Sequence, residues 1–169
     1  MKSVLLSMLI VLSGWAINVG EIPKNVSIDG DNGGLVAGGA WESSMLKDKV
    51  YVMFYVDPDE KSVNQHFSKA LKAQEYDRNN FGSLAIINLA ATWKPNFIIE
   101  KILKSKQEEF PFTIYAKDKD KVLVKAWDIG DDASNILIFS KNGTLLFYKS
   151  GKMEEEDMQK AFSIIQDNL

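Results

Sequence analysis

The sequence predicts an α/β protein in which helices cover both faces of a mixed central sheet. Residues Val50–Val56 are all apolar, which is the pattern of a strand that is buried on both faces. A helical segment follows, and then a second largely apolar run at Ser83–Leu89, which favours a parallel crossover between two strands. Near the end of the chain, Asn142-Gly143 separates two further apolar runs and is typical of a β-hairpin.

The residues before the central strand are rich in glycine, which indicates short extended pieces joined by turns. We expect Asn25–Ile28 and Leu35–Ala37 to be the extended pieces of an N-terminal β-hairpin. Asp29-Gly30-Asp31 resembles the start of a calcium-binding loop, but Ala40 stands where that loop requires a glutamate. A turn is therefore the better interpretation, and Trp41–Leu46 fits a short helical turn or a loop.

Apolar residues that recur every three or four positions predict three helices. The first, Glu60–Gln74, has an apolar stripe that includes Phe67, and it is preceded by acidic residues that complement a helix dipole. The second is opened by Thr92–Pro95 and runs to about Lys106, and the third is Glu154–Asn168.

The remaining predicted strands are Phe112–Ala116, Asn135–Phe139 and Thr144–Tyr148. The last two form the hairpin and run antiparallel, whereas the earlier crossovers are parallel, so the sheet is mixed in direction. Val122–Trp127 is short and rich in apolar residues, and its pattern fits a helix or a strand.

Residues 1–16 have the features of a cleavable export signal. Lys2 provides a positive start, Val4–Leu12 is a short apolar run, and small residues precede the expected cleavage after Ala16. The run is too short to cross a membrane, which takes about 20 apolar residues. A buried N-terminal helix is the alternative, but core helices are usually amphipathic. We expect an exported chain of residues 17–169 that forms one domain without stable membrane insertion.

The composition excludes several classes of site and partner. The chain has no cysteine, so disulfides, thiol catalysis, cysteine-based zinc sites and iron–sulfur clusters are excluded. The formal net charge is −3, and loss of Lys2 with the signal makes it −4. A mildly acidic chain whose only arginine is Arg78 is a poor match for nucleic acid. The length is sufficient for a domain that buries roughly 70% of its unfolded surface.

The order of elements resembles a thioredoxin-like three-layer fold, in its TlpA and peroxiredoxin-like branch. The residues that carry this resemblance are Lys49-Val50, Phe54-Tyr55, Ser140-Lys141-Asn142-Gly143 and Gly151. More narrowly, nearly all of the expected mature chain resembles the YtfJ family of exported bacterial proteins. The similar stretches are Trp41–Tyr55, Ile86-Ile87-Asn88, Lys125-Ala126-Trp127, Ala133-Ser134 and Asn135–Gly151.

The family resemblance implies a periplasmic location and a function that is largely uncharacterised. Some descriptions of the family suggest a transcriptional regulator, but the export signal and the acidic charge argue against a regulator that touches DNA.

The thioredoxin resemblance implies where redox residues would lie. Asp59 stands at the position of the attacking cysteine, Ser62 at that of the resolving cysteine, and Ser134 at that of a cis-proline. A thiolate is the nucleophile in thiol–disulfide chemistry, and neither a carboxylate nor a serine without a base replaces it. The sequence therefore excludes a thiol oxidoreductase or peroxidase, and we assign no catalytic residue and expect no cofactor.

In open α/β sheets, ligands bind beyond the carboxyl ends of the strands. We therefore expect a binding groove around the turn after the central strand, for a protein, a peptide or a small ligand. Its candidate residues are Tyr55, Asp57, Asp59, Ser62, Trp93 and Ser134. Exposed aromatic side chains beside such a groove suit peptide or ligand binding, although core packing is the simpler interpretation of Trp93 and Trp127.

Two other functions remain open at this point. The carboxylates of Asp57, Asp59 and Glu60 are the type of ligand that binds a hard cation, which predicts a metal-assisted enzyme as an alternative. Capping of the following helix is the simpler role for these side chains, so we assign no metal ligand. The other alternative is a regulatory protein. His66, the only histidine, lies on the flank of the helical stripe, where a packing role is expected.

Overall fold

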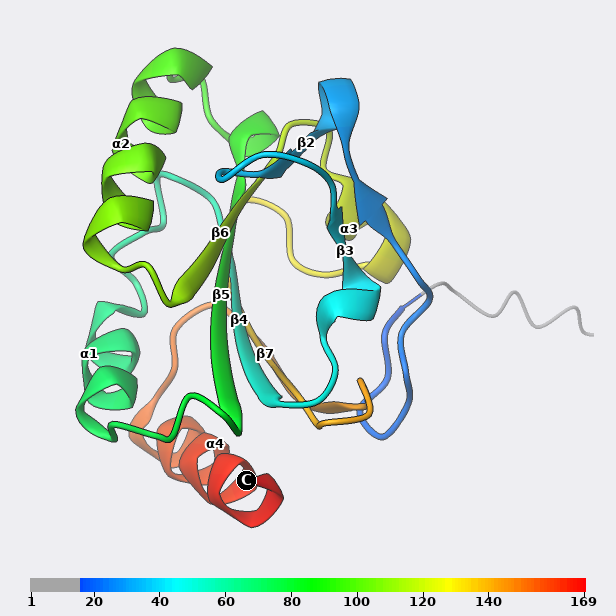
Figure 1. The fold of residues 1–169 in the computed structure, drawn as a ribbon, viewed down its shortest axis with the longest axis vertical. Coiled ribbons are helices and arrows are strands. Elements are labelled where there is room, and N and C mark those ends of the chain that lie inside the picture. The colour runs from blue at the N-terminus through cyan, green and yellow to red at the C-terminus, as the bar shows by residue number, and fades with distance from the viewer. Residues whose placement is uncertain (1–15) are drawn as a thin grey trace, which may run out of the picture.

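The computed structural model describes residues 16–169, so the predicted export signal lies outside the described residues except for Ala16. Figure 1 shows a central sheet between two layers. The strands are β1 (Ser27–Ile28), β2 (Gly33–Leu35), β3 (Trp41–Glu42), β4 (Val50–Val56), β5 (Phe81–Asn88), β6 (Thr113–Asp118), β7 (Ser134–Phe139) and β8 (Leu145–Ser150). The helices are α1 (Gln65–Ala73), α2 (Asn96–Glu109), α3 (Val122–Trp127) and α4 (Glu155–Asn168).

The main sheet has six strands in the order β2-β6-β5-β4-β7-β8. Strands β4, β5 and β6 are parallel, while β2, β7 and β8 join antiparallel to their neighbours. Strand β4 lies between β5 and β7 and its bounds are those expected from its apolar run. The predicted mixed sheet is therefore confirmed, and the turn that follows β4 lies at the carboxyl edge of the parallel strands.

Each face of the sheet buries its own part of the core. One face packs against α1 and α4 through residues such as Phe67 and Ile165, and α2 continues that layer over β5 and β6. The other face packs against α3 and the N-terminal strands, where Trp41 and Trp127 meet edge to face with ring centroids 6.4 Å apart. Trp127 is thus a core residue, the simpler of its two interpretations.

The N-terminal segment pairs differently from the expected hairpin. Strand β1 pairs antiparallel with β3, so the second partner is Trp41–Glu42 rather than residues 35–37. Strand β2 instead lies along β6 at the edge of the main sheet. At Gly33, an added Cβ would lie 2.0 Å from the carbonyl oxygen of Lys117. Glycine therefore allows β2 to approach β6 closely, and the glycine-rich stretch does more than form turns.

The start of α1 differs from the expected one, and the structure decides the run whose pattern fitted either a helix or a strand. Helix α1 begins at Gln65 instead of Glu60, because residues 58–64 form successive turns. The ambiguous run at Val122–Trp127 is helix α3. Asp118, at the end of β6, accepts hydrogen bonds from the amides of Val122 and Leu123 and so starts this helix. Within residues 16–169, none of the helices has the length and apolarity needed to cross a membrane.

Candidate functional site

The turn after β4 is held by backbone and side-chain hydrogen bonds from both sides. The amide of Asp57 donates to the carbonyl of Ala133, 2.9 Å away, which joins the turn to the residue before β7. The Asp57 carboxylate accepts the amide of Asp59 at 2.8 Å, a local bond that favours a turn over a helix. Asp57 is only 5% exposed. This side chain therefore shapes the turn and does not cap α1, whose first residue is eight positions further on.

Asp59 lies on the outer side of the same turn and joins it to the loop after β5. Its carboxylate accepts hydrogen bonds from the hydroxyl of Thr92, at 2.8 Å, and from the ammonium of Lys94. The bond from Lys94, followed by that from Thr92, lowers the pKa of Asp59 below its ordinary value. Asp59 thus remains an ionised anchor for the residues that lead into α2.

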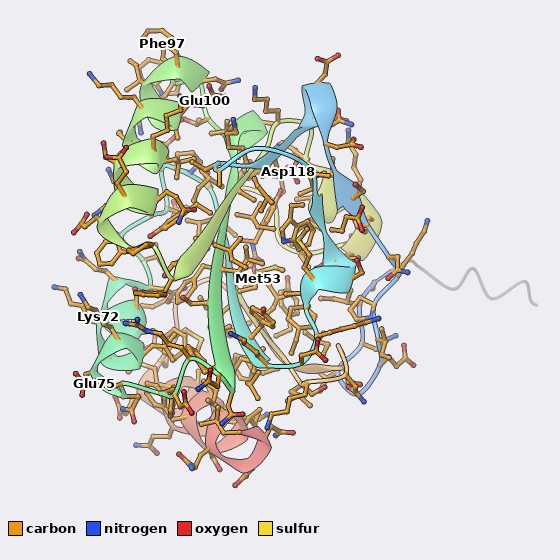
Figure 2. The ribbon with its side chains drawn as sticks, in the orientation of Figure 1. Met53, Lys72, Glu75, Phe97, Glu100 and Asp118 are labelled. Atoms are coloured by element: carbon orange, nitrogen blue, oxygen red, sulfur yellow. The ribbon has the colours of Figure 1, made fainter. Side chains whose placement is uncertain are left out.

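Tyr55 points to the opposite side of the sheet and is completely buried. Its hydroxyl donates to a carboxyl oxygen of Asp118 at 3.1 Å. The two carboxyl oxygens of Asp118 also accept the amides of Asp120, Val122 and Leu123. Burial, followed by the negative charge of Asp118, raises the pKa of Tyr55 far above its ordinary value. Figure 2 shows Asp118 between the sheet and the α3 side, away from α2.

A second buried network lies between the turn and α4. The side-chain amide of Asn64 donates to the hydroxyl of Ser134 at 3.0 Å and to the carbonyl of Gly151 at 2.9 Å. Its oxygen accepts the amide of Met153 at 2.8 Å. Asn64 and Ser134 are 4% and 3% exposed. One side chain therefore ties the turn to β7 and to the residues that enter α4, and His66 adds a bond of 2.7 Å to the carbonyl of Met153.

The six residues expected to line one groove are divided by the structure into two groups. Asp59, Ser62 and Trp93 are exposed, whereas Tyr55, Asp57 and Ser134 are buried. The expectation that Tyr55 and Trp93 share a groove is wrong, because Tyr55 faces α3 and Trp93 is 87% exposed. The alternation of side chains along a strand explains this, since Tyr55 shares the face of Met53. The accessible part of the candidate site is therefore the outer side of the turn.

The predicted alternative of a metal site gains no support from the geometry. Asp57 binds a backbone amide and Asp59 binds Thr92 and Lys94, so their carboxylates serve different partners. Within residues 16–169, no group of three acidic or histidine side chains is arranged to hold a metal ion.

The loop after β5 and the start of α2 expose apolar side chains next to this turn. Trp93 precedes α2, and Phe97, Ile98 and Ile102 are 72%, 46% and 52% exposed on the helix. Figure 2 shows Phe97 at the outer end of α2, directed away from the sheet. Core packing, the simpler interpretation of Trp93, is wrong, and this surface is accessible to a partner.

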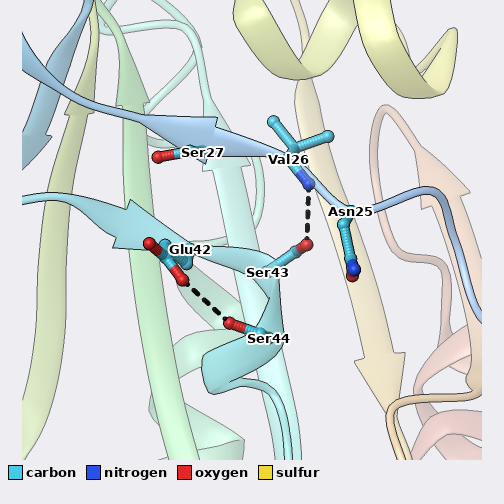
Figure 3. Close-up of a pocket in the computed structure, with 6 residues that line it drawn as sticks. All are labelled: Asn25, Val26, Ser27, Glu42, Ser43 and Ser44. Carbon is cyan, nitrogen blue, oxygen red and sulfur yellow. Dashed lines mark hydrogen bonds between the residues drawn. The ribbon is translucent and has the colours of Figure 1, made fainter.

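A shallow hollow lies elsewhere, beside the N-terminal pair β1 and β3. It encloses about 290 Å³ and is lined by Asn25, Val26, Ser27, Glu42, Ser43 and Ser44. Figure 3 shows that Ser43 accepts the amide of Val26 and that Ser44 donates to Glu42, so two of the hydroxyls that line the hollow already have partners. The hollow has none of the strand-end positions on which the candidate site is built.

Sequence reasoning missed Asn64 and Asp118, the two residues that organise the buried side of the site. Asp118 carried a usable signal, because an acidic residue shortly before the apolar run Val122–Trp127 is typical of a helix start. Asn64 carried none, since its partners lie 70 to 89 residues away along the chain.

Comparisons with known proteins find a matching family and relatives that are described as uncharacterised. The model of a family described as "Bacterial protein of unknown function (YtfJ_HI0045)" matches residues 24–168. The chain is 22% identical over 132 residues to "Uncharacterized protein YtfJ" of Escherichia coli (strain K12), covering 76% of this chain and 72% of the relative. It is 27% identical over 129 residues to an uncharacterised protein of Haemophilus influenzae, covering 74% and 70%.

Among solved structures, the chain is similar to the exposed lipoprotein thioredoxin Etrx1 of Streptococcus pneumoniae. The TM-score is 0.59 at 12% sequence identity, and the match covers 83% of this chain and 98% of that protein. At this identity the likeness establishes the fold, which is thioredoxin-like.

Proposed function

Since the chain belongs to the family of bacterial proteins of unknown function described as YtfJ_HI0045, we propose that it is a non-catalytic binding protein built on a thioredoxin-like fold. Its binding surface, which we name the turn surface, consists of Asp59, Ser62 and the loop residues Thr92–Lys94. The partner is a protein or a peptide.

The exposure of Trp93 carries this proposal. A tryptophan that is 87% exposed leaves a large apolar area in water, and such residues are enriched at the centres of protein interfaces. It lies in the loop that Asp59 anchors, beside a turn that contains no thiol. Anchoring reduces the entropy that the loop loses when a partner binds.

Export to the periplasm is part of the proposal. The positive start, the apolar run Val4–Leu12 and the small residues Gly14 and Ala16 before the expected cleavage site support it. Cell fractionation with N-terminal sequencing tests it, and we expect a periplasmic chain that begins at Ile17. An uncleaved chain in the cytoplasm would contradict export and return the regulatory alternative to first place.

In-cell photo-crosslinking tests the binding surface itself. A photoreactive residue replaces Ser62 or Trp93 in the full chain, and Lys160 on α4 receives the same probe as a control. We expect discrete crosslinked bands from Ser62 and Trp93 and none from Lys160, which is exposed on another helix. Equal bands from all three positions, or none from the turn surface, would refute the proposal.

A further inference from the structure

Apolar side chains on helix α2 extend beyond the face that packs against the protein. Ile99 and Leu103 are buried over β5 and β6 together with Leu89. Phe97, Ile98 and Ile102 lie on the outer side and remain exposed. A surface helix normally has one apolar stripe and a polar outer face, so the exposed apolar side chains require another explanation. An exposed apolar group that continues from Trp93 is the usual mark of an interaction site.

The same outer face has unpaired positive charge. Lys101 and Lys104 follow Phe97 by one and two helical turns and are exposed. Neither ammonium has an ion-pair partner among the described residues. By contrast, Lys106 on the same helix pairs with Glu109 at 2.7 Å.

The charges that surround this face are also mainly positive. Lys94 pairs with Asp59, and the single carboxylate of Glu100 is shared by Lys117 at 3.5 Å and Lys119 at 3.1 Å. With Lys101, Lys104 and the Lys106 that pairs with Glu109, six lysines stand against four carboxylates, those of Asp59, Glu100, Glu108 and Glu109, a surplus of two positive charges. The complete chain has a formal net charge of −3, so this region is opposite in sign to the molecule.

We infer that the outer face of α2, defined as Phe97, Ile98, Lys101, Ile102 and Lys104, binds an acidic segment of another protein that also carries apolar side chains. The inference rests on the proposed function and extends the turn surface along α2. The apolar side chains supply area to bury, and the two lysines select a segment of negative charge.

An anionic membrane fits the surface less well than a protein segment. Interfacial helices have a long apolar stripe flanked by basic residues on the polar face. Helix α2 has 14 residues, and its last turn exposes Glu108 and Glu109, which an anionic surface would repel. The apolar group is confined to the first two turns and to Trp93, a size that suits a short protein segment.

The test places a photoreactive residue at Ile98 of the full chain inside the cells that make it. The crosslinked segment of the partner is identified by mass spectrometry. We expect a segment of another protein with more aspartate and glutamate than lysine and arginine. A phospholipid adduct, a crosslink to a second copy of this chain, or a neutral or basic segment would overturn the inference.

Charge reversal supplies the second readout. Lys101→Glu with Lys104→Glu should reduce the yield of the Ile98 crosslink about tenfold, because like charges then face each other. Lys160→Glu, a reversal on α4, should leave the yield unchanged. The three lysines are exposed, so each variant should retain the thermal midpoint of the parent chain. An equal loss of crosslink yield in the Lys101/Lys104 variant and in the Lys160 variant would contradict the inference.

The probes at Ser62 and Trp93 separate this inference from the proposed function. Crosslinked bands from Ser62 and Trp93 without one from Ile98 would show that the turn surface binds a partner and that the inference about an acidic segment on α2 is wrong. The same conclusion follows if charge reversal at Lys101 and Lys104 leaves all bands unchanged. If none of the three positions gives a band, both proposals fail together.

Discussion

At the scale of single residues, buried polar side chains hold the shape of the turn. Asn64 satisfies both ends of its amide with three bonds, to Ser134, Gly151 and Met153. These partners belong to the start of β7 and to the connection between β8 and α4. A hydrogen-bonded side-chain amide in the interior contributes to stability mainly because removing that side chain leaves other buried polar groups without partners.

Replacement of Asn64 by alanine should therefore lower the free energy of unfolding by about 2–3 kcal/mol, because the Met153 amide and the Gly151 carbonyl lose a partner. Urea denaturation at neutral pH measures this change. Asn96→Ala at the exposed start of α2 is the matched control and should stay within about 0.5 kcal/mol of the parent. A small effect at Asn64 would show that water replaces its bonds.

At the scale of elements, one exposed cluster joins two loops that follow neighbouring strands. Asp59 belongs to the turn after β4, and Thr92 and Lys94 belong to the loop after β5. Because the strands are parallel, their carboxyl ends meet at one edge and bring the two loops together. The position of Trp93 depends on this link, since Trp93 lies between the two residues that bind Asp59.

Asp59→Ala should loosen the loop after β5 and leave the core intact. We expect faster amide hydrogen exchange at residues 90–94 and unchanged exchange in β4 and α4. Glu60→Ala, at the neighbouring acidic residue, should leave the loop as it is. Unchanged exchange at residues 90–94 in the Asp59 variant would mean that other contacts fix Trp93.

The same link should respond to acid. The pKa of Asp59 is lowered by its bonds from Lys94 and Thr92, so the folded state favours the ionised carboxylate. The contribution of the ionised Asp59 carboxylate to stability is complete above the ordinary pKa of an aspartate, about 3.9. It is lost as the pH falls through the lowered pKa of Asp59. In acid, the amide hydrogen exchange of residues 90–94 in the parent chain should then approach that of the Asp59→Ala variant.

At the scale of the whole molecule, the polar groups are sorted between the two faces of the sheet. The face that packs against α3 buries Tyr55 together with Asp118. The accessible polar groups lie on the outer side of the turn after β4. Several tyrosines have a raised pKa because burial disfavours the ionised phenol, Tyr55 above all. The molecule should consequently lose stability in alkaline solution.

The Tyr55→Phe variant measures this loss at one residue. At pH 7 it should be less stable by about 1–2 kcal/mol, since Asp118 loses one of its donors. The unfolded chain ionises tyrosine near pH 10, whereas the folded chain keeps Tyr55 neutral. The stabilising effect is therefore full below about pH 10 and is lost as the pH rises.

The difference between the variant and the parent should then shrink by about 1.4 kcal/mol at pH 11, which urea denaturation at several pH values can measure. Tyr115→Phe is a control without this hydrogen bond, because burial, followed by the negative charge of Glu109, raises the pKa of Tyr115, and among the described residues its hydroxyl makes no hydrogen bond. A difference in free energy of unfolding between Tyr55→Phe and the parent that stays constant with pH would contradict the buried, neutral state of Tyr55.

The sequence alone was sufficient to predict the elements whose buried residues form a recognisable apolar pattern along the chain. Val50–Val56 is a buried strand with the expected bounds, and the hairpin at Asn142-Gly143 and the C-terminal helix are confirmed. The lack of cysteine by itself excludes thiol chemistry, whatever the fold. These conclusions depend on residue type and spacing, which need no knowledge of distant partners.

Tertiary structure decided which side chains could be reached and which had partners. It separated Tyr55 from Trp93, moved the start of α1 to Gln65 and brought Asn64 to Ser134. Local pattern reports that a residue is buried or exposed on average, but not which residues far along the chain meet it. The binding surface depends on contacts between loops that follow separate strands, and those contacts exist only after the sheet has formed.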